Sequence, residues 1–277
     1  YTWMQELQTK PVQPELALAR ARAADETKKM MRRLSKDNTK LYARHLGKIS
    51  HSNPVVVFEG ILSQIQSYDN LIEPVVEMMR CLSPLSFDVL SYCILYQLTQ
   101  SKSLLKDDGL NVSQWMTSLS SFCGHLYKRW PVMEAGGLLQ YVVQTLKQGK
   151  TVPLILLRDL VTKMAGIDAI EDLSDHQIAA QSGSATLRAC ATDVRGIARN
   201  TKKSSERLKA ALVGHGLVVP LLILIAQRRS SCIFHVESTQ LKLIGELFDR
   251  THETLEQFAT FVQNNIAPAE YAKIGRP

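Results

Sequence analysis

The segment WMTSLSSFCGHLYKRW, residues 115–130, decides the fold class. Its large apolar side chains follow one another at intervals of four, three, four and four residues: Trp115, Leu119, Phe122, Leu126 and Trp130. This spacing places all of them on one face of an α-helix that is roughly five turns long. A half-buried β-strand would need strict alternation of apolar and polar residues, which the segment lacks.

The same helical spacing recurs on both sides of this segment. Asn53-Pro54 and Ser83-Pro84 each place a capping residue before a proline at the first helical position, which predicts two helix starts. Glycines and short polar stretches separate the remaining periodic segments. The predicted helices are 15–46, 54–67, 70–82, 84–100, 111–130, 134–148, 152–165, 204–214, 217–229, 237–249 and 252–265, with a weak helix at 173–181.

These short amphipathic helices predict an all-α fold of stacked antiparallel helix pairs. A single pair cannot bury its apolar face alone, so neighbouring pairs stack into a helical-repeat, HEAT-like solenoid. A compact irregular bundle is the competing architecture. We expect two parts: a basic N-terminal segment at 1–50, mostly one helix packing on the array, and a helical-repeat domain at 51–277. Since the chain opens with Tyr1 rather than Met, we also expect a fragment of a longer protein.

The net charge of +7 is concentrated near the N-terminus. Residues 20–48 hold ten basic and three acidic side chains, so this region accounts for the whole excess. Such a basic stripe is compatible with nucleic acid, an acidic partner or merely solvated surface. Candidate nucleic-acid-binding residues within it are Lys28, Lys29, Arg32 and Arg33.

The sequence contains no complete motif for catalysis, for a cofactor or for a metal. The stretch QGKT at 148–151 resembles the end of a phosphate-binding loop, but Gln144 stands where a glycine is needed and a helix precedes it. A G-x-S-x-G nucleophile motif is absent, and the five cysteines are widely spaced without C-x-x-C. The sequence therefore predicts a protein that is not an enzyme and needs no cofactor or metal. The longest apolar stretch, 217–226, is far below the ~20 residues of a membrane span, so no membrane partner is expected.

The most distinctive polar segment is RNTKKSSERLK at 199–209, where a loop is expected to enter a helix. Ser204 or Ser205 could cap that helix. The functional interpretation is a surface that meets phosphate or an acidic partner at a helix start, and the alternative is a solvated, capped helix entry. The candidate partner-binding residues, for a helicase or RNA, are Asn200, Lys202, Lys203 and Arg207.

Beyond these patterns, long and unusual segments resemble a known family. RHLGKISHSNPVVVFEGILSQIQSYDNLIEPVVE, at 44–77, is similar to part of the large scaffold subunit of the THO complex. Six further segments continue this resemblance in the same order, and none of them falls within 168–194. They are FDVLSYCIL (87–95), SLSSFCG (118–124), GLLQYV (137–142), LVTKMAGI (160–167), RNTKKSSERLKAAL (199–212) and ELFDRTHETLEQF (246–258).

The resemblance implies a middle region of a nuclear protein with an all-helical, MIF4G-like repeat. It further implies a scaffold without catalytic activity in the THO/TREX assembly for mRNA export. Such a scaffold holds the other THO subunits together and presents a DEAD-box RNA helicase to nascent transcripts. The assignment of Asn200, Lys202, Lys203 and Arg207 to the helicase is our hypothesis. The alternative function is direct RNA binding by a helical module through its basic N-terminal region.

Overall fold

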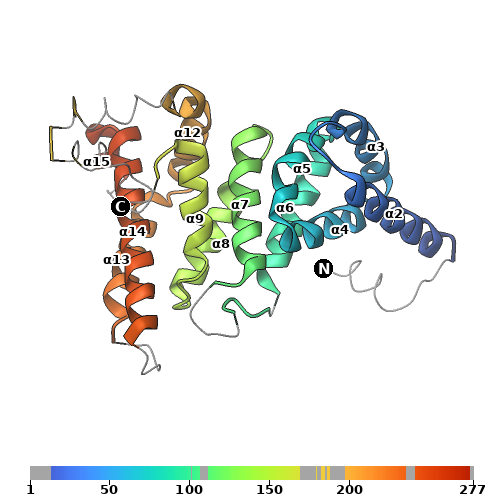
Figure 1. Cartoon of the computed structure of the whole chain (residues 1–277). Coiled ribbons are helices and arrows are strands. Elements are labelled where there is room, and N and C mark those ends of the chain that lie inside the picture. Colours follow the sequence, from blue (N-terminus) through green and yellow to red (C-terminus); the bar gives the residue numbers. More distant parts are fainter. Residues whose placement is uncertain are drawn as a thin grey trace. The chain divides into compact units, whose positions relative to one another are not determined.

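The prediction of an all-α fold is confirmed by the computed structural model (Figure 1). The structure describes residues 14–100, 102–106, 112–168, 179, 182–184, 186–187, 197–234 and 241–274. Every named element in these ranges is helical, and one isolated bridge pairs Leu105 with Val112. The chain forms two compact units, residues 1–100 and 101–277. The expected domain division between residues 50 and 51 stays a prediction, and both of these residues lie inside one helix.

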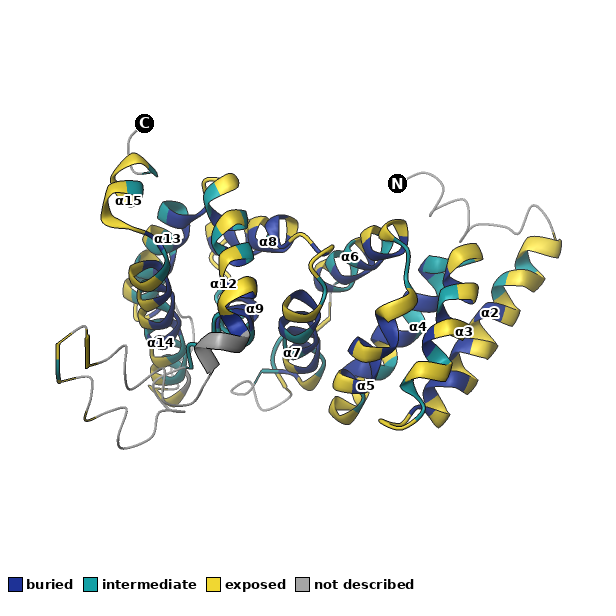
Figure 2. Cartoon of the chain, turned by 90° about the horizontal axis from the view of Figure 1, so that it is seen from above, coloured by how far each residue is buried: buried dark blue, intermediate teal, exposed yellow. Residues whose placement is uncertain are grey.

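Unit 1 is a stack of helices in which each α-helix packs against the α-helix two positions later in the chain. Thus α2 contacts α4, α3 contacts α5, and α4 contacts α6. The fully buried side chains of Phe58, Ile61, Leu62 and Ile65 lie on α4, whose buried surface is dark blue in Figure 2. The elements are α2 (Pro14–Arg33), α3 (Thr39–Ser52), α4 (Pro54–Ser67), η1 (Asp69–Leu71), α5 (Ile72–Met78), η2 (Met79–Cys81) and α6 (Pro84–Thr99).

The prediction of a single helix over residues 15–46 is wrong. The chain breaks after Arg33 because Asn38 supplies hydrogen bonds that a continued helix would have made through its backbone. The Asn38 side-chain amide donates to the carbonyl of Arg33 at 2.7 Å, and its oxygen accepts from the amide of Ser35 at 2.8 Å. The basic region is therefore divided between two helices, α2 and α3.

Unit 2 packs around the pair α7 and α9 and around the pair α13 and α14. Buried aromatic side chains from α7 and α14, including Phe122, Phe258 and Phe261, lie in its core. Gly166 ends a short π-helical turn with a left-handed φ of 71°, a conformation that favours glycine. The elements are α7 (Gln114–Arg129), α8 (Gly136–Lys147), α9 (Leu154–Leu160), η3 (Val161–Ala165), α12 (Ile197–Gly214), α13 (Val218–Ser231), α14 (Leu241–Asn265) and α15 (Pro268–Ile274).

Two predicted boundaries in unit 2 are wrong. The helix expected at 204–214 is already formed from the first described residue of this segment, Ile197, onward. The two helices expected at 237–249 and 252–265 form one helix, α14, over the described residues, and positions 237–240 lie outside the described part of the chain. Thr251, which could have capped a new helix, instead donates its hydroxyl to the carbonyl of Leu247 within α14. Apart from residue 179, the weak helix expected at 173–181 lies outside the described residues.

Over the described ranges, none of the helices is both long enough and apolar enough to span a membrane by itself. The helices Thr201–Gly214 and Val218–Ser231 reach the required length and apolar composition only when taken together, and a bend of 88° separates them.

Candidate interaction surfaces

The predicted partner-binding segment lies inside α12 rather than at a loop. Lys202 and Lys203 lie within the described helix Ile197–Gly214, and both side chains are exposed. The backbone of Asn200 lies in the same helix, while its side chain falls outside the described atoms. The expectation of a loop entering a helix here is therefore wrong, although the two lysines still face solvent.

The serines that follow are packing residues and not caps. The Ser204 hydroxyl is buried and donates to the carbonyl of Met164 at 2.6 Å, at the end of the π-helical turn. Ser205 donates to the side-chain oxygen of Asn265 on α14, also at 2.6 Å. These bonds hold the inner face of α12 against two neighbouring segments.

Arg207 binds the backbone carbonyls at the C-terminal end of α7. Its guanidinium donates to the carbonyls of Tyr127 at 2.9 Å, Lys128 at 2.8 Å and Trp130 at 3.1 Å. The last carbonyls of a helix lack intrahelical partners and carry partial negative charge, so a cation placed there is favourable. Burial lowers the pKa of Arg207 from its ordinary value. The side chain that the sequence assigned to a partner thus holds α12 to α7.

A second arginine, Arg228, makes the corresponding contact with α8, and no sequence pattern predicted it. Arg228 on α13 donates to the carbonyls of Leu146 at 2.8 Å and Lys147 at 3.4 Å. Beside it, Gly149 turns the chain with a φ of 89°. No local sequence signal marks this role, because the arginine and its acceptors are about 80 residues apart.

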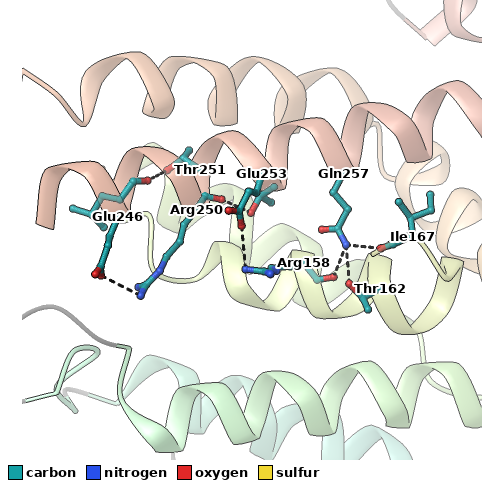
Figure 3. Close-up of polar contacts among 10 residues, drawn as sticks. Arg158, Thr162, Ile167, Glu246, Arg250, Thr251, Glu253 and Gln257 are labelled. Atoms are coloured by element: carbon teal, nitrogen blue, oxygen red, sulfur yellow. Dashed lines mark hydrogen bonds and ion pairs between the residues drawn. The ribbon is translucent and has the colours of Figure 1, made fainter. Parts of the chain in front are cut away.

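A buried polar network joins α9 to α14 (Figure 3). The Gln257 amide donates to the hydroxyl of Thr162 at 2.7 Å and to the carbonyl of Ile167 at 2.6 Å. Glu253, also buried, forms an ion pair with Arg158 at 3.3 Å. These contacts satisfy the Thr162 hydroxyl and the Ile167 carbonyl beside the π-helical turn, which indicates a structural role. The side-chain oxygen of Gln257 is buried without a hydrogen-bond partner among the described residues.

Asp159 is the most perturbed carboxyl group of this region. Burial raises its pKa to about 6, against the opposing effect of Lys163 and Arg158. Perturbed carboxyls occur at catalytic sites, but structural networks produce them too. Over the described residues, no group of three or more His, Cys, Asp or Glu side chains could hold a metal ion.

The basic candidates of α2 are all exposed. Lys28, Lys29, Arg32 and Arg33 lie on its C-terminal half, and Lys29 forms an ion pair with Asp25 one turn earlier at 2.7 Å. The structure therefore places the four residues near one another on a solvated surface, with one of them partly neutralised.

Helix α3 carries a second basic surface, which was not among the predicted binding residues. Lys40, Arg44, Lys48 and His51 are spaced four, four and three residues apart, and all four are exposed. This spacing puts them on one face of the helix. We call these four residues the α3 stripe. The spacing was visible in the sequence, but the incorrect single helix over 15–46 joined Lys40 and Arg44 to the basic residues of α2 and ended before Lys48 and His51.

Comparison with known proteins gives consistent matches along the chain. Residues 46–120 match the family Thoc2, described as "Transcription- and export-related complex subunit". The human THO complex subunit 2 is 45% identical over 262 residues, which cover 94% of this chain and 16% of that protein. The Arabidopsis thaliana protein of the same name is 41% identical over 269 residues, covering 94% of this chain and 15% of its own length. The chain is a relative of THO complex subunit 2.

The match to THO complex subunit 2 extends to a distant relative. The Saccharomyces cerevisiae protein of that name is 22% identical over 244 residues, covering 88% of this chain and 15% of the yeast protein. The chain spans about a sixth of the length of the THO complex subunit 2 proteins that it matches. The resemblance found in the sequence segments is thereby confirmed.

Proposed function

We propose that this chain is a non-catalytic scaffold segment of the nuclear THO/TREX complex. In that role it organises other THO subunits and presents a DEAD-box RNA helicase during transcription-coupled mRNP assembly and mRNA export. The observation that carries the proposal is the 45% identity with human THO complex subunit 2 over 94% of the chain. The names of the relatives support membership of such a complex, and the helicase is our finer assignment.

The packing of the helices supports a scaffold role. Stacked helix layers expose long edges relative to their cores, which suits several simultaneous protein contacts. In unit 2, the ends of α7 and α8 are fixed by Arg207 and Arg228, so these edges are held rigidly. A rigid surface that binds one arrangement of two helicase lobes more tightly raises the population of that arrangement without any chemistry of its own.

Within α12, we assign the helicase contact to Lys202 and Lys203, with Asn200 beside them. Both lysines are exposed on the same helix. Arg207, whose guanidinium is bound to three carbonyls, supports this edge by fixing α12 to α7. The partner expected from this chemistry is an acidic protein surface, because lysines at an interface rim chiefly steer and orient an oppositely charged partner.

The test is an ATPase and binding assay with the purified helicase and the 277-residue chain. Adding the chain should raise the helicase ATPase rate, and the double variant Lys202→Glu, Lys203→Glu should weaken binding about tenfold through charge repulsion. The matched control is Lys147→Glu, Lys150→Glu, which reverses two exposed lysines elsewhere in unit 2 and should leave affinity unchanged.

Three results decide the assignment. Selective loss in the α12 variant supports it. An equal loss of affinity in both variants would mean that overall charge causes the effect, and it would remove Lys202 and Lys203 from the proposal. Absence of binding and of ATPase stimulation by the unmodified chain would contradict the helicase function itself.

A further inference from the structure

The α3 stripe has a geometry suited to a linear polyanion. Lys40, Arg44 and Lys48 follow one another at intervals of four residues along α3, which separates their backbone positions by about 6 Å each. His51 extends the row by one more turn. A row of single positive charges at regular intervals lets successive cations meet successive phosphates of an extended strand.

The stripe borders a hollow between α3 and the turn η2. This hollow has a volume of about 620 Å³ and is lined by Arg44, Gly47, Lys48, His51 and Cys81. A Cβ atom added to Gly47 would lie 2.8 Å from the carbonyl oxygen of Cys81, so the glycine permits the close approach of the two segments. The lining contains three basic side chains and no carboxylate.

The charges of the α3 stripe are not neutralised within the described part of unit 1. The nearby Lys29 and Lys36 form ion pairs with acidic side chains, and the His45 ring lies 3.6 Å from the Glu26 carboxylate. None of the ion pairs over the described residues involves the α3 stripe. A phosphate chain would supply the missing negative charges and would release its own counterions on binding.

We propose that the α3 stripe is a binding site for the phosphate backbone of single-stranded RNA, centred on Arg44 and Lys48 with His51 at its end. This site would bind with little sequence preference, because phosphate contacts position a strand and do not specify bases. The proposal locates the RNA-binding function on α3 and not on the α2 residues Lys28, Lys29, Arg32 and Arg33.

An acidic protein partner is the competing occupant, and the surface favours RNA. Protein interfaces usually have an apolar centre with large aromatic or aliphatic anchors. The lining of the hollow has none, since its uncharged members are Gly47 and Cys81. One exposed leucine, Leu41, lies on α3, and isolated exposed leucines are common on protein surfaces.

The test measures binding of a labelled oligouridylate of about 15 nucleotides by fluorescence anisotropy at several salt concentrations. The double variant Arg44→Gln, Lys48→Gln should lower affinity about tenfold at low salt and reduce the salt slope by about 1.4, or ~0.7 for each lost phosphate contact. The matched control is Lys28→Gln, Arg32→Gln on α2, which removes the same charge and should change affinity less than twofold.

Each outcome bears on the proposal. A loss confined to the α3 variant, with unchanged circular dichroism, supports it. Equal losses in both variants, or no binding by the unmodified chain at low salt, would overturn it. Tighter binding of a polyglutamate peptide of equal charge would overturn it in favour of an acidic protein. The proposal is independent of the scaffold function, because the helicase assay probes lysines of α12 and this assay probes α3.

Discussion

Helices α3 and α12 are both rich in basic residues, but they use these residues differently. In α12, Arg207 is bonded to three carbonyls of the α7 end and Lys209 is paired with Glu270 at 2.6 Å. In α3, Arg44 and Lys48 are exposed, and no ion pair of the described residues includes them. The comparison shows that basic composition does not determine availability for a partner. Availability depends on whether a neighbouring helix end offers acceptors to the cation.

The largest expected effect tests the structural role of Arg207. The Arg207→Met variant keeps most of the aliphatic stem but leaves three carbonyls without their charged donor, so the free energy of unfolding should fall by about 3 kcal/mol. Arg44→Met on α3 is the matched control and should change stability by less than about 0.5 kcal/mol. Urea unfolding followed by circular dichroism measures the free energy of unfolding of both variants. Similar losses of stability in the two would contradict the different roles assigned to Arg207 and Arg44.

An effect of similar size, about 3 kcal/mol over the whole titration, is expected from the carboxyl of Asp159. Because its pKa is raised from 3.8 to about 6, the folded protein binds more protons than the unfolded chain between these values. Stability should therefore fall as the pH rises from about 4 through 6 and level off near pH 7.

Asp159→Asn imitates the protonated carboxyl and should remove this fall in stability. The control Asp88→Asn changes an exposed carboxyl on α6 and should retain it. Urea unfolding at a series of pH values distinguishes the two, and an unchanged pH dependence in Asp159→Asn would show that this group is not its source.

The smallest effect concerns two glycines in helices of the two units. Gly47→Ala in α3 should destabilise the protein by about 1 kcal/mol, since the new Cβ would lie 2.8 Å from the Cys81 carbonyl oxygen. Gly245→Ala in α14 meets no atom within 4 Å and should stabilise it by about 0.5–1 kcal/mol through helix propensity. Thermal unfolding should show a lower melting temperature for Gly47→Ala and a higher one for Gly245→Ala. Stabilisation by Gly47→Ala would mean that α3 can move away from η2.

Local patterns in the sequence were sufficient for much of the fold. The helices at 54–67 and 84–100 were predicted almost to the residue, because Pro54 and Pro84 mark their starts unambiguously. The break near Asn38 was missed, although the polar run from Ser35 to Thr39 is typical of a turn. The prediction gave more weight to the helical spacing of apolar residues on both sides of this run than to the run itself. The helical residues from Ile197 to Lys203 were missed because serines suggested a later cap.

The candidate surfaces were less predictable, for a physical reason. Exposure of Lys202 and Lys203 follows from local helical position, so the sequence could anticipate it. The role of Arg207 depends on carbonyls 77 to 80 residues earlier, and no local pattern encodes such a contact. The α3 stripe was visible as a spacing of four residues, yet its lack of ion pairs could be established only from the positions of neighbouring acidic groups.

The contact between Arg207 and α7 has a consequence for how the chain is made. Residues 127–130 leave the ribosome 77 to 80 residues before Arg207 leaves it, and at about 5–20 residues per second this interval lasts roughly 4 to 16 s. During that time the end of α7 lacks its arginine and depends on water. A nascent chain stopped before residue 207 would therefore keep a frayed helix, which chaperones could recognise until synthesis resumes.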